Sequence, residues 1–480
     1  MNFREIKFGK TDAQIESLEY PQLLVDGYFN TTNIVERATD KTTFLFLGYK
    51  GSGKSALSEH LKLSNPDCMV DQILLKDFPY NSLGNILTGE AEKEVKLKVA
   101  WRWLLLAYAL NSLKDDSTAK CTMQKEFDKA IELLTQTGIF PLTNISNLVT
   151  KTTTSNFKSS VKAFSYERTT LRESTQVSFY FAIDYIKKLI ISFKEHHNHL
   201  IVIDGLDEIL TTRDIQYAAI ASLINEVKDL NTFFLTNNIS IKIIVLCRTD
   251  IFERLPDPNK NKIRQDCSFS FSWYNEGLDD QSNCDLVKLA NLRTNMCYPN
   301  VKNMFDTFFP KQYKNKNIAT ALLEFTRHTP RDFLQLLNCI QSQCRQDRVD
   351  YVDISYGLKL YSKEYFLPEI KDEMAGYIPA DKIDEIINVF SALRSRDFKY
   401  NEVEVLYRDN PILSNLPLDN VLKILFDCSA IGQKYLYNDG SNGYSKTRIT
   451  FKYRNRNSSI KKTDKFLLHK GLWKALNVNY

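Results

Sequence analysis

Short hydrophobic runs alternate with segments of helical spacing over the first half of the chain. Phe44–Leu47 is a four-residue apolar run that predicts a buried strand, and Leu200–Ile203 and Ile241–Leu246 are runs of the same kind. A further strand is expected at Asp71–Leu75. Because helical patterns separate these strands, we expect an α/β fold in which a parallel sheet has helices on both faces.

The pattern changes twice further along the chain. From about Leu278 to Tyr365 the spacing is helical, with a break at His328-Thr329-Pro330, and this predicts a helical lid. Pro368–Pro379 is interpreted as a linker, and the last hundred residues as a separate unit. The expected domains are therefore a core at 1–277 with a helical and Ser/Thr-rich insertion at about 85–178, a lid at 278–367 and a C-terminal domain at 381–480.

The insertion ends in a stretch of unusual composition. Ser and Thr are dense from about residue 143 to 178, including Thr150–Asn156. We interpret this stretch as a surface loop, with a partner contact as the alternative.

The first predicted strand leads directly into a glycine-rich loop. Gly48–Ser55 fits the pattern G-x-x-x-x-G-K-[ST], and a helix is expected from Ser55 to Leu63. Glycines let the backbone N–H groups turn toward a polyphosphate, and the helix N-terminus favours its negative charge. Lys54 is expected to reach the β- and γ-phosphates, and Ser55 to bind Mg²⁺. The expected nucleotide-binding residues are Gly48, Lys50, Gly51, Ser52, Gly53, Lys54, Ser55 and Ala56.

A carboxylate follows another predicted strand. Asp204 comes directly after Leu200–Ile203, at the carboxyl end of the strand, where ligands collect in α/β sheets. We predict that Asp204 holds Mg²⁺. Asp207 and Glu208 lie just beyond it, and either can orient the attacking water, with Glu208 slightly favoured. The alternative is a strand followed by an ordinary acidic turn.

Two arginines are candidate nucleotide sensors. Arg248 follows the strand Ile241–Leu246 and can act at the γ-phosphate, the alternative being a helix cap or an ion pair. Arg331 follows Pro330 at a predicted helix start in the lid, where it either senses the nucleotide or pairs with a nearby carboxylate. Arg254 and Arg264 are weaker candidates for contacts across a subunit interface.

The C-terminal domain carries most of the positive charge. Residues 441–480 contain ten Lys or Arg and one Asp, a formal charge of +9. Predicted helices followed by strands at Ile431–Tyr437 and Lys446–Arg454 suggest a winged helix. A basic wing fits phosphate-backbone contact, although a charge-protected edge strand or a protein contact also fits. The candidate DNA-binding residues are Lys446, Arg448, Lys452, Arg454 and Arg456.

Composition sets limits without identifying a function. With 43% hydrophobic and 25% charged residues in 480, the chain is typical of a globular protein, and a net charge of +5 identifies no partner. The nine cysteines include no C-x-x-C and are interpreted as reduced thiols, and His196, His197 and His199 as loop residues outside any zinc site. No signal peptide or apolar run of about 20 residues is visible, so we expect a soluble, cytoplasmic protein without membrane contact.

Several motifs together resemble the STAND and NACHT-like branch of P-loop ATPases. They are the loop Gly48–Ser55, the string Asp204-Gly205-Leu206-Asp207-Glu208, Arg248 and Pro330-Arg331-Asp332. Compact prokaryotic ATPases of this type are also similar at Phe8–Ala13 and His469–Leu476. The resemblance implies ATP as the nucleotide, nucleotide-dependent switching or assembly, and roles in antiphage defence or stress signalling. Lys50 and the lack of a recognisable repeat array depart from the NACHT pattern and leave the trigger open.

Three other functions remain open at the level of sequence. The chain can be an oligomeric switch or scaffold that hydrolyses little ATP, working through copies of itself or a protein effector. It can also be an origin-initiator-like AAA+ DNA-binding protein, although Asp204–Glu208 and Arg248 differ from the adjacent Asp-Glu and polar sensor usual in that class. A small-molecule kinase is disfavoured because no separate acceptor site is visible.

Overall fold

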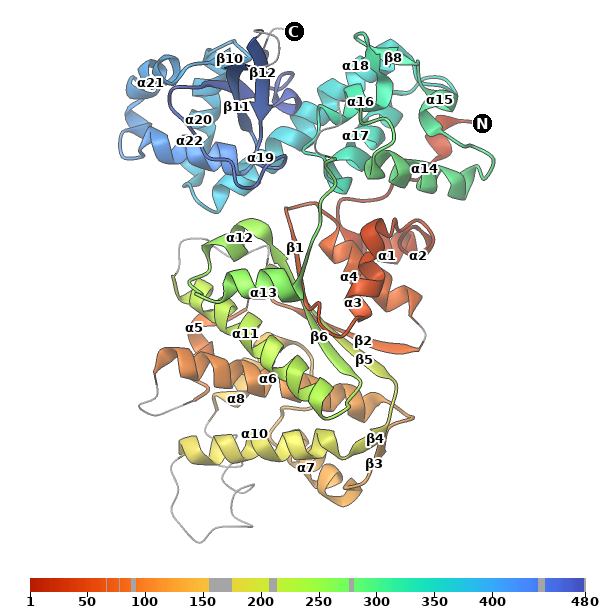
Figure 1. Ribbon diagram of the computed structural model, residues 1–480, viewed down its shortest axis with the longest axis vertical. Helices are drawn as coiled ribbons and strands as arrows, with labels where there is room; N and C mark the ends of the chain where they lie inside the picture. The colour runs from red at the N-terminus through yellow and green to blue at the C-terminus, as the bar shows by residue number, and fades with distance from the viewer. Residues whose placement is uncertain are drawn as a thin grey trace.

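A parallel sheet of five strands forms the centre of the protein (Figure 1). The computed structural model describes residues 1–65, 67–76, 78–87, 92–154, 175–206, 214–275, 280–438 and 445–478. The strand order is β2-β5-β6-β1-β7, and every neighbouring pair is parallel. The strands are β1 (Leu45–Gly48), β2 (Cys68–Leu74), β5 (Asn198–Asp204), β6 (Ile241–Arg248) and β7 (Ser268–Ser270). This confirms the predicted α/β fold.

Alternate residues of each central strand face different hydrophobic cores. In β6, Ile243 and Val245 join one core while Ile244 and Leu246 join another. Successive side chains of a strand point to opposite faces, so near-continuous apolar runs require helices on both sides. One face is covered by α3 (Ile34–Thr39) and α4 (Lys54–Ser64), and the other by α6 (Lys93–Asp115) and α11 (Asp214–Thr236). A further helix, α10 (Thr175–Ile191), packs against α6.

The insertion is largely helical and packs into the larger of these two cores. Trp101 and Trp103 of α6 are fully buried there, so this aromatic pair serves packing. The Ser/Thr-rich stretch begins with a helix, whereas residues 155–174 lie outside the described residues. The remaining elements of the insertion and its surroundings are α5 (Tyr80–Leu83), β3 (Lys120–Cys121), α7 (Gln124–Gln136), α8 (Ile145–Thr152) and β4 (Phe193–Glu195).

After β6 the chain forms two short helices, α12 (Thr249–Arg254) and α13 (Lys260–Cys267), and then β7 at the edge of the sheet, before it enters the lid. The predicted break is present, because α17 begins at Pro330 after a gap from α16. The prediction of a linker at Pro368–Pro379 is wrong, because most of this segment belongs to helix α19 (Leu367–Ala375). The lid elements are α14 (Asp285–Cys297), α15 (Met304–Phe308), β8 (Gln312–Tyr313), β9 (Lys316–Asn317), α16 (Ile318–Leu323), α17 (Pro330–Gln343), α18 (Tyr351–Leu360), the π-helix η4 (Tyr361–Phe366) and α19 (Leu367–Ala375).

The C-terminal unit, residues 380–478, combines helices with an antiparallel sheet of order β10-β13-β11-β12. The predicted hairpin of β11 and β12 is present, from Gln433 opposite Thr450 to Asn438 opposite Ser445. Its second strand ends at Thr450, four residues before the predicted Arg454, because Phe451 turns into the interior. The elements are α20 (Ala380–Ala392), β10 (Asp397–Phe398), α21 (Tyr400–Arg408), η5 (Pro411–Leu413), α22 (Leu418–Asp427), β11 (Ile431–Asn438), β12 (Ser445–Thr450), β13 (Lys465–Leu468) and η6 (Lys470–Leu472).

The chain's first residues belong to the core of the lid and not to that of the sheet. Phe3, Ile6 and Phe8 lie in one buried cluster with residues of the lid and the C-terminal unit. The rest of the lead-in, residues 9–41, then runs beside α4 (Figure 1). The first eight residues contain η1 (Phe3–Glu5), and residues 9–41 contain α1 (Ala13–Glu19), α2 (Pro21–Val25) and η2 (Thr31–Asn33) as well as α3. Within the described ranges, every helix is too short or too polar to cross a bilayer.

Candidate functional site

The glycine-rich loop connects β1 to α4, as the sequence pattern predicts. Gly51 and Gly53 have φ values of +77° and +98°, a region that side chains disfavour. Gly48 is needed for a different reason, because a Cβ there would lie 2.2 Å from the Ser52 hydroxyl oxygen. On the other side of the loop, the Trp273 indole nitrogen donates to the Ser52 carbonyl at 2.9 Å. The loop is therefore held in a tight turn that exposes backbone at the start of α4.

Lys54 is folded back over this loop. Its Nζ donates to the carbonyls of Gly48 and Tyr49 at 3.2 and 3.3 Å, and only 3% of the residue is exposed. This buried amine lines a cavity, where an anion can replace the two carbonyls as its acceptor. Ser55 follows in the first turn of α4, where the helix dipole adds to this positive field.

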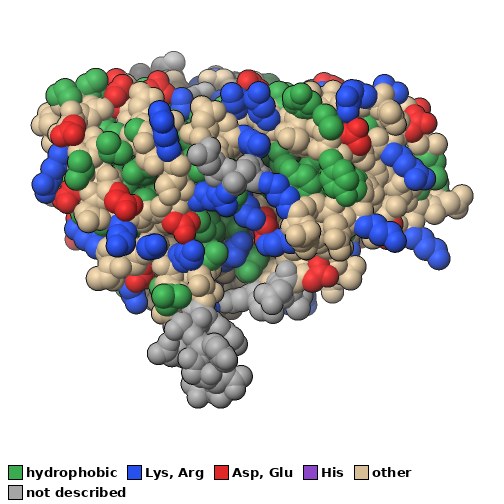
Figure 2. All heavy atoms as spheres, turned by 90° about the horizontal axis from the view of Figure 1, so that it is seen from above, with side chains coloured by type: hydrophobic (Ala, Val, Ile, Leu, Met, Phe, Trp, Pro, Cys, Tyr) green, Lys and Arg blue, Asp and Glu red, His purple; other side chains and the backbone are tan. Residues whose placement is uncertain are grey.

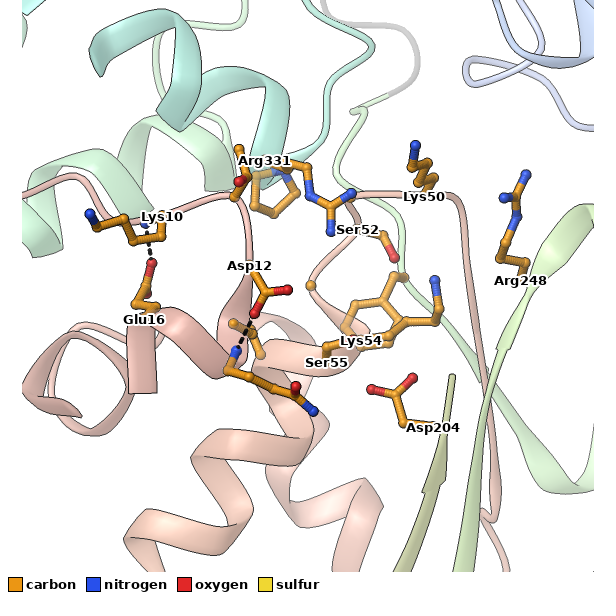
Figure 3. A pocket seen from close by; sticks show the side chains of 18 of the residues that line it. Lys10, Asp12, Glu16, Lys50, Ser52, Lys54, Ser55, Asp204, Arg248 and Arg331 are labelled. Atoms are coloured by element: carbon orange, nitrogen blue, oxygen red, sulfur yellow. Dashed lines mark hydrogen bonds between the residues drawn. The ribbon is translucent and has the colours of Figure 1, made fainter. Parts of the chain in front are cut away.

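The loop forms one wall of a cavity of about 610 Å³, a size common for small-molecule sites. Figure 3 shows the cavity between the lead-in, the loop, the end of β5 and the start of α17. Each predicted nucleotide-binding residue except Gly48 lines it, and Gly48 lies at the base of the loop. Tyr28, Phe29, Phe271 and Trp273 supply an aromatic part of the wall.

Asp204 brings a buried carboxylate to the same cavity. It is 7% exposed, and one carboxylate oxygen accepts the N–H of Gly205 at 2.7 Å. Gly205 has a φ of +85°, and a Cβ there would lie 3.0 Å from the Leu75 nitrogen, so glycine lets the chain pass beside β2. The strand of Asp204 is not hydrogen-bonded to the loop's strand, since β6 lies between β5 and β1.

Ser55 and Asp204 fit a magnesium ion by the chemistry of their donor atoms. Mg²⁺ prefers hydroxyl, carboxylate and phosphate oxygens. Ser55 and Asp204 line the same cavity as Lys54. Asp207 and Glu208, the predicted water-orienting residues, lie outside the described residues.

Arg248 lines the cavity but is engaged by a carboxylate. Its guanidinium donates two hydrogen bonds to Asp250, at 2.9 and 2.8 Å, and Tyr377 donates to the same carboxylate at 3.3 Å. Burial would raise the pKa of Asp250, but the charge of Arg248 outweighs it and the pKa lies below its usual value. The ion pair that the sequence analysis gave as an alternative role for Arg248 is thus present, and Arg248 also lines the cavity.

Arg331 lies in the first turn of α17, directly over the glycine-rich loop. Its backbone N–H donates to the Gly51 carbonyl at 3.3 Å, and a Cβ on Gly51 would lie 3.0 Å from its own Cβ. Figure 3 shows the guanidinium reaching toward Ser52. Within the described parts of the chain, this guanidinium has no ion-pair partner within 4 Å, so the alternative of a structural ion pair is not realised there.

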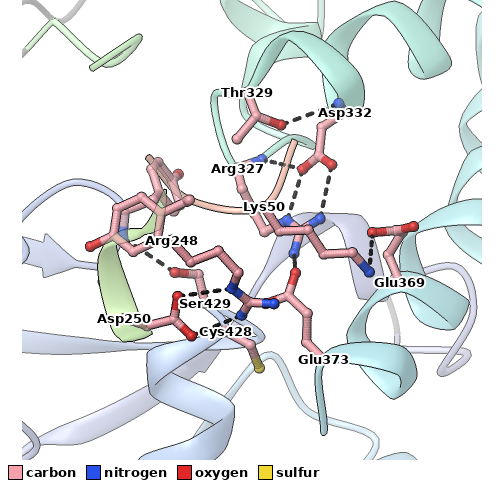
Figure 4. A network of polar contacts seen from close by, with 12 residues as sticks. Lys50, Arg248, Asp250, Arg327, Thr329, Asp332, Glu369, Glu373, Cys428 and Ser429 are labelled. Atoms are coloured by element: carbon pink, nitrogen blue, oxygen red, sulfur yellow. Dashed lines mark hydrogen bonds and ion pairs between the residues drawn. The ribbon is translucent and has the colours of Figure 1, made fainter. Parts of the chain in front are cut away.

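A buried ion cluster fixes the helix that carries Arg331 (Figure 4). Arg327 donates to both oxygens of Asp332, at 2.8 and 2.9 Å, and also pairs with Glu373 of α19. Thr329 caps the helix by accepting the Asp332 N–H at 3.2 Å. Burial would raise the pKa of Asp332, yet the Arg327 charge lowers it to about 2.

The sequence did not reveal the contribution of α19. Lys50 of the loop pairs with Glu369 at 3.0 Å, and Asp372, Glu373 and Tyr377 line the cavity beside the glycine-rich loop. Ile370, Met374 and Ile378 are buried at helical spacing, and this pattern is visible in the sequence. Pro368 and Pro379 nevertheless led to the prediction of a linker. That prediction overlooked that proline is tolerated in the first turn of a helix, where Pro368 lies.

The lead-in closes the cavity at the side away from β5. Arg293 of α14 forms a buried ion pair with Glu16 at 2.7 Å, and Asp12 caps α1. Gly9, with a φ of +103°, is required here, because a Cβ would lie 2.0 Å from the Arg293 guanidinium. The segment Phe8–Ala13 is thereby held between lid and sheet.

The candidate DNA-binding residues of the C-terminal unit that the structure describes have different surroundings. Arg448 is exposed on β12, the strand that also contains Lys446. Lys452 instead donates to the Ser458 carbonyl at 3.0 Å. Arg454 lies over the rings of Tyr274 and Tyr453, at 5.2 and 5.5 Å, so it faces the lid. Arg456 lies in a short turn beyond, and Arg254 and Arg264 are engaged within the chain by Asp427 and Glu253.

One curated protein and one solved structure are similar to this chain at low sequence identity. No family model matches the chain. The putative transposon gamma-delta 80.3 kDa protein of Escherichia coli (strain K12) is 24% identical over 326 residues, which are 63% of this chain and 44% of that protein. The chain therefore spans less than half the length of this relative. Among solved structures, the Aeropyrum pernix ORC1 protein in complex with DNA aligns over 91% of this chain and 92% of its own, with 11% identity and a TM-score of 0.39.

Proposed function

We propose that this chain is a Mg²⁺-dependent ATPase of the STAND/NACHT-like P-loop type that couples its nucleotide state to a partner or a nucleic acid. The proposal is carried by one observation, the convergence of Lys54, Ser55, Asp204 and Arg331 on a single cavity. These residues offer a cation for the phosphates, two oxygen ligands for a metal and a second cation from the lid.

Each residue has a distinct task in this proposal. Lys54 exchanges the carbonyls of Gly48 and Tyr49 for phosphate oxygens, while the N–H groups of the loop bind the remaining charge. Mg²⁺ held by Ser55 and Asp204 neutralises charge on the phosphates. Glu208, or Asp207, orients the attacking water and accepts its proton.

Nucleotide state is passed to the lid through α17. A γ-phosphate gives the Arg331 guanidinium an anionic partner, and α17 is joined to α19 through Arg327 and Glu373. Arg248 takes part only if it leaves Asp250. The output acts on a protein effector, on further copies of the chain, or on DNA bound at Arg448 and neighbouring basic residues of the C-terminal unit.

ATP turnover by the purified protein is the first test, with and without duplex and single-stranded DNA. Both DNA forms are included because the curated relative is named as a transposon protein. We expect turnover that Lys54→Ala abolishes, while Lys462→Ala, a surface control, leaves it unchanged. If both variants kept the turnover of the unmodified protein, the proposal would be contradicted. Stimulation by DNA that is lost in Arg448→Ala would support coupling through the C-terminal unit.

A nucleotide-driven switch with little turnover is the second candidate. It is favoured by the ion pairs Lys50–Glu369 and Arg248–Asp250, which engage two cavity-lining cations with groups of the chain itself. Glu208→Gln separates the two functions. An ATPase loses its output in this variant, whereas a switch held by ATP keeps or gains it, as measured by oligomer size after ATP addition.

A role in antiphage defence or stress signalling in the cytoplasm follows from the family resemblance alone. A phage-challenge assay of cells expressing the protein or its Lys54→Ala variant tests it. Protection lost in the variant is the expected result, and equal survival of both strains would remove this part of the proposal.

A further inference from the structure

A small cavity of about 30 Å³ lies at the junction of the core, the lid and the C-terminal unit. Its wall includes Tyr49 of the glycine-rich loop, Thr329 of the lid and residues 427–429 of the C-terminal unit. It has room for only about two water molecules, so it is a packing junction and not a ligand site. The side chains that line both this junction and the cavity beside the glycine-rich loop are Lys50, Arg248, Glu373 and Tyr377. A group that binds beside the loop can thus affect the C-terminal unit through one layer of side chains.

At this junction Arg248 is held by Asp250 (Figure 4). The guanidinium donates two hydrogen bonds to the carboxylate, at 2.9 and 2.8 Å, and both side chains are mostly buried. Tyr377 donates to the same carboxylate at 3.3 Å. Two parallel bonds to one carboxylate fix the position of a guanidinium, so Arg248 has to break both before it can contact a phosphate.

A second cation, Arg254, is within reach of Asp250. The two residues are four positions apart in α12, the spacing at which opposite charges lie side by side on a helix. Burial would raise the pKa of Asp250, yet the charge of Arg248 and, less strongly, that of Arg254 hold it below its usual value. Because a mostly buried carboxylate needs a cation, Asp250 can release Arg248 at little cost only if Arg254 replaces it.

In the structure Arg254 serves the C-terminal unit as well. It forms an ion pair with Asp427, the last residue of α22, at 3.7 Å. Its guanidinium also lies 4.4 Å from the centre of the Tyr377 ring, whose hydroxyl donates to Asp250. Burial raises the pKa of Asp427, and the charges of Lys452 and Arg254 offset this only in part. Asp250 and Asp427 therefore compete for one guanidinium.

The same side of the C-terminal unit touches the glycine-rich loop. The Tyr49 hydroxyl donates to the Lys452 carbonyl at 3.4 Å, and the Lys452 amine lies 4.0 Å from Asp427. The Lys54 amine donates to the Tyr49 carbonyl at 3.3 Å, a bond that a phosphate replaces in the proposed function. The C-terminal unit is thus docked beside the loop as well as beside the end of β6.

The outer side of the C-terminal unit is accessible while its inner side is docked. Viewed from above, blue Lys and Arg side chains gather around a hollow on the face formed by the lid and the C-terminal unit (Figure 2). In the hairpin of β11 and β12, Leu436 and Arg448 are exposed and lie outside the junction. A partner can therefore bind the outer side before any contact of the junction is broken.

We propose that Asp250 is a positioning residue for Arg248 and that the C-terminal unit controls it by holding Arg254. This inference rests on the proposed function, because Arg248 acts here on the γ-phosphate of a bound nucleotide. While the C-terminal unit is docked, Asp427 holds Arg254, and Asp250 keeps Arg248 away from the γ-phosphate. When a partner displaces the C-terminal unit, Arg254 turns to Asp250, and Arg248 can leave for the γ-phosphate.

The γ-phosphate makes this exchange measurable. When Arg248 reaches it, a triphosphate gains a charge-assisted contact, whereas a diphosphate has no oxygen at that position. Variants that release Arg248 should therefore raise the affinity for a triphosphate and leave the affinity for a diphosphate unchanged. A general structural defect at the junction would instead change both affinities.

Calorimetry with Mg²⁺ and either ADP or the non-hydrolysable ATP analogue AMPPNP measures the ratio of the two affinities in the full chain. Asp427→Asn removes the competing carboxylate, and Asp250→Asn removes the group that holds Arg248. Asp427→Glu is the conservative variant, because it keeps the carboxylate. Asp419→Asn is the matched control, since it makes the same change on the same helix at a side chain that is 54% exposed. Circular dichroism confirms that every variant is folded.

We expect the affinity for AMPPNP relative to ADP to rise roughly two- to fivefold in Asp427→Asn, and by at least as much in Asp250→Asn. The double variant should show no more than the Asp250→Asn effect, because both changes act through Arg248. Adding Arg248→Ala to Asp250→Asn should abolish the gain. Asp419→Asn and Asp427→Glu should keep the ratio of the unmodified protein. An unchanged ratio in either Asp427→Asn or Asp250→Asn, an equal rise in Asp419→Asn, or a gain that survives Arg248→Ala would each overturn the inference.

Failure of this inference is distinguishable from failure of the proposed function. If the unmodified protein binds both nucleotides and Lys54→Ala abolishes this binding, but the ratio is the same in all variants, only the role of Asp250 is wrong. If the unmodified protein binds neither nucleotide, the proposed function and this inference are both wrong.

Discussion

Individual glycines of the loop have separable roles. Gly51 and Gly53 both adopt positive φ, but their surroundings differ. A Cβ on Gly51 would meet Arg331 of the lid, whereas one on Gly53 meets no atom of the described residues within 4 Å. Gly51 therefore lets the lid approach the loop, while Gly53 leaves space open at the start of α4.

Substitution of these two glycines by alanine should separate lid packing from nucleotide binding. Each substitution is expected to cost about 1 kcal/mol from the left-handed backbone alone. Gly51→Ala should lose additional stability without nucleotide, because the new methyl group crowds Arg331. Urea unfolding measures this difference, and equal stabilities of the two variants would contradict it. Gly53→Ala should show its larger defect in ATP affinity, since its methyl group enters the space open to phosphates.

The candidate site was predictable wherever a residue's role depends on its neighbours in sequence. Lys54, Ser55 and Asp204 follow strands that the apolar runs reveal, so their positions at the edge of the sheet could be inferred. Arg454 could not be placed in this way. It lies over Tyr274, 180 positions earlier, and only tertiary packing brings the two together.

At the scale of elements, α17 is the helix on which the lid's contact with the loop depends. Its first turn holds Arg331 over Gly51, and its start is fixed by the buried pair of Arg327 and Asp332. Asp332 is fully buried and also accepts from the Tyr365 hydroxyl at 2.9 Å. Loss of this carboxylate leaves Arg327 with Glu373 as its partner.

Asp332→Asn should therefore destabilise the protein by about 3 kcal/mol, as expected when one partner of a buried ion pair is removed. The folded-state pKa of about 2 lies below the ordinary value of 3.8, so the carboxylate's contribution is present above about pH 4 and is lost as the pH falls toward 2. Urea unfolding at pH 7 and pH 3 measures both effects. Glu404→Gln, in the exposed pair with Arg408, should cost less than about 1 kcal/mol.

The two helices that frame the loop differed in how well they could be predicted. Pro330 marks the start of α17 because proline fits the first turn, and the prediction placed Arg331 correctly in that turn. Proline led to the wrong prediction of a linker at Pro368, which also lies in the first turn of a helix. Since α18, η4 and α19 follow each other without a break, Pro368 lies inside a continuous helical run.

At the scale of the molecule, three buried histidines make stability depend on pH. Burial lowers the pKa of His199 to about 4 and of His328 and His469 to about 3, and nearby cationic or histidine side chains lower them further. All three lie below the ordinary value of 6.5. The unfolded chain therefore binds protons that the folded chain excludes once the pH falls below about 6.5.

We expect the free energy of unfolding to decrease between pH 6.5 and 4, approaching about 1.4 kcal/mol per pH unit for each of these histidines. Urea unfolding across this range measures the slope. His328→Asn should reduce it by about one histidine's share, and asparagine tolerates the φ of +51° at this position. Stability that is constant from pH 6.5 to 5 would show that these histidines already accept protons in the folded state.

The place of the first eight residues has a consequence for synthesis on the ribosome. Phe3 donates its N–H to the Asp347 carbonyl, and Gln341 donates to the carbonyls of Phe3 and Ile6. These partners emerge more than 330 residues later, which at 5–20 residues per second is a delay of roughly 17–70 s. During that interval Phe3, Ile6 and Phe8 have no finished core to enter, although the sheet can already fold. The beginning of the chain is thus among the last parts to be completed, and nascent chains stalled before residue 340 should expose it to chaperones and proteases.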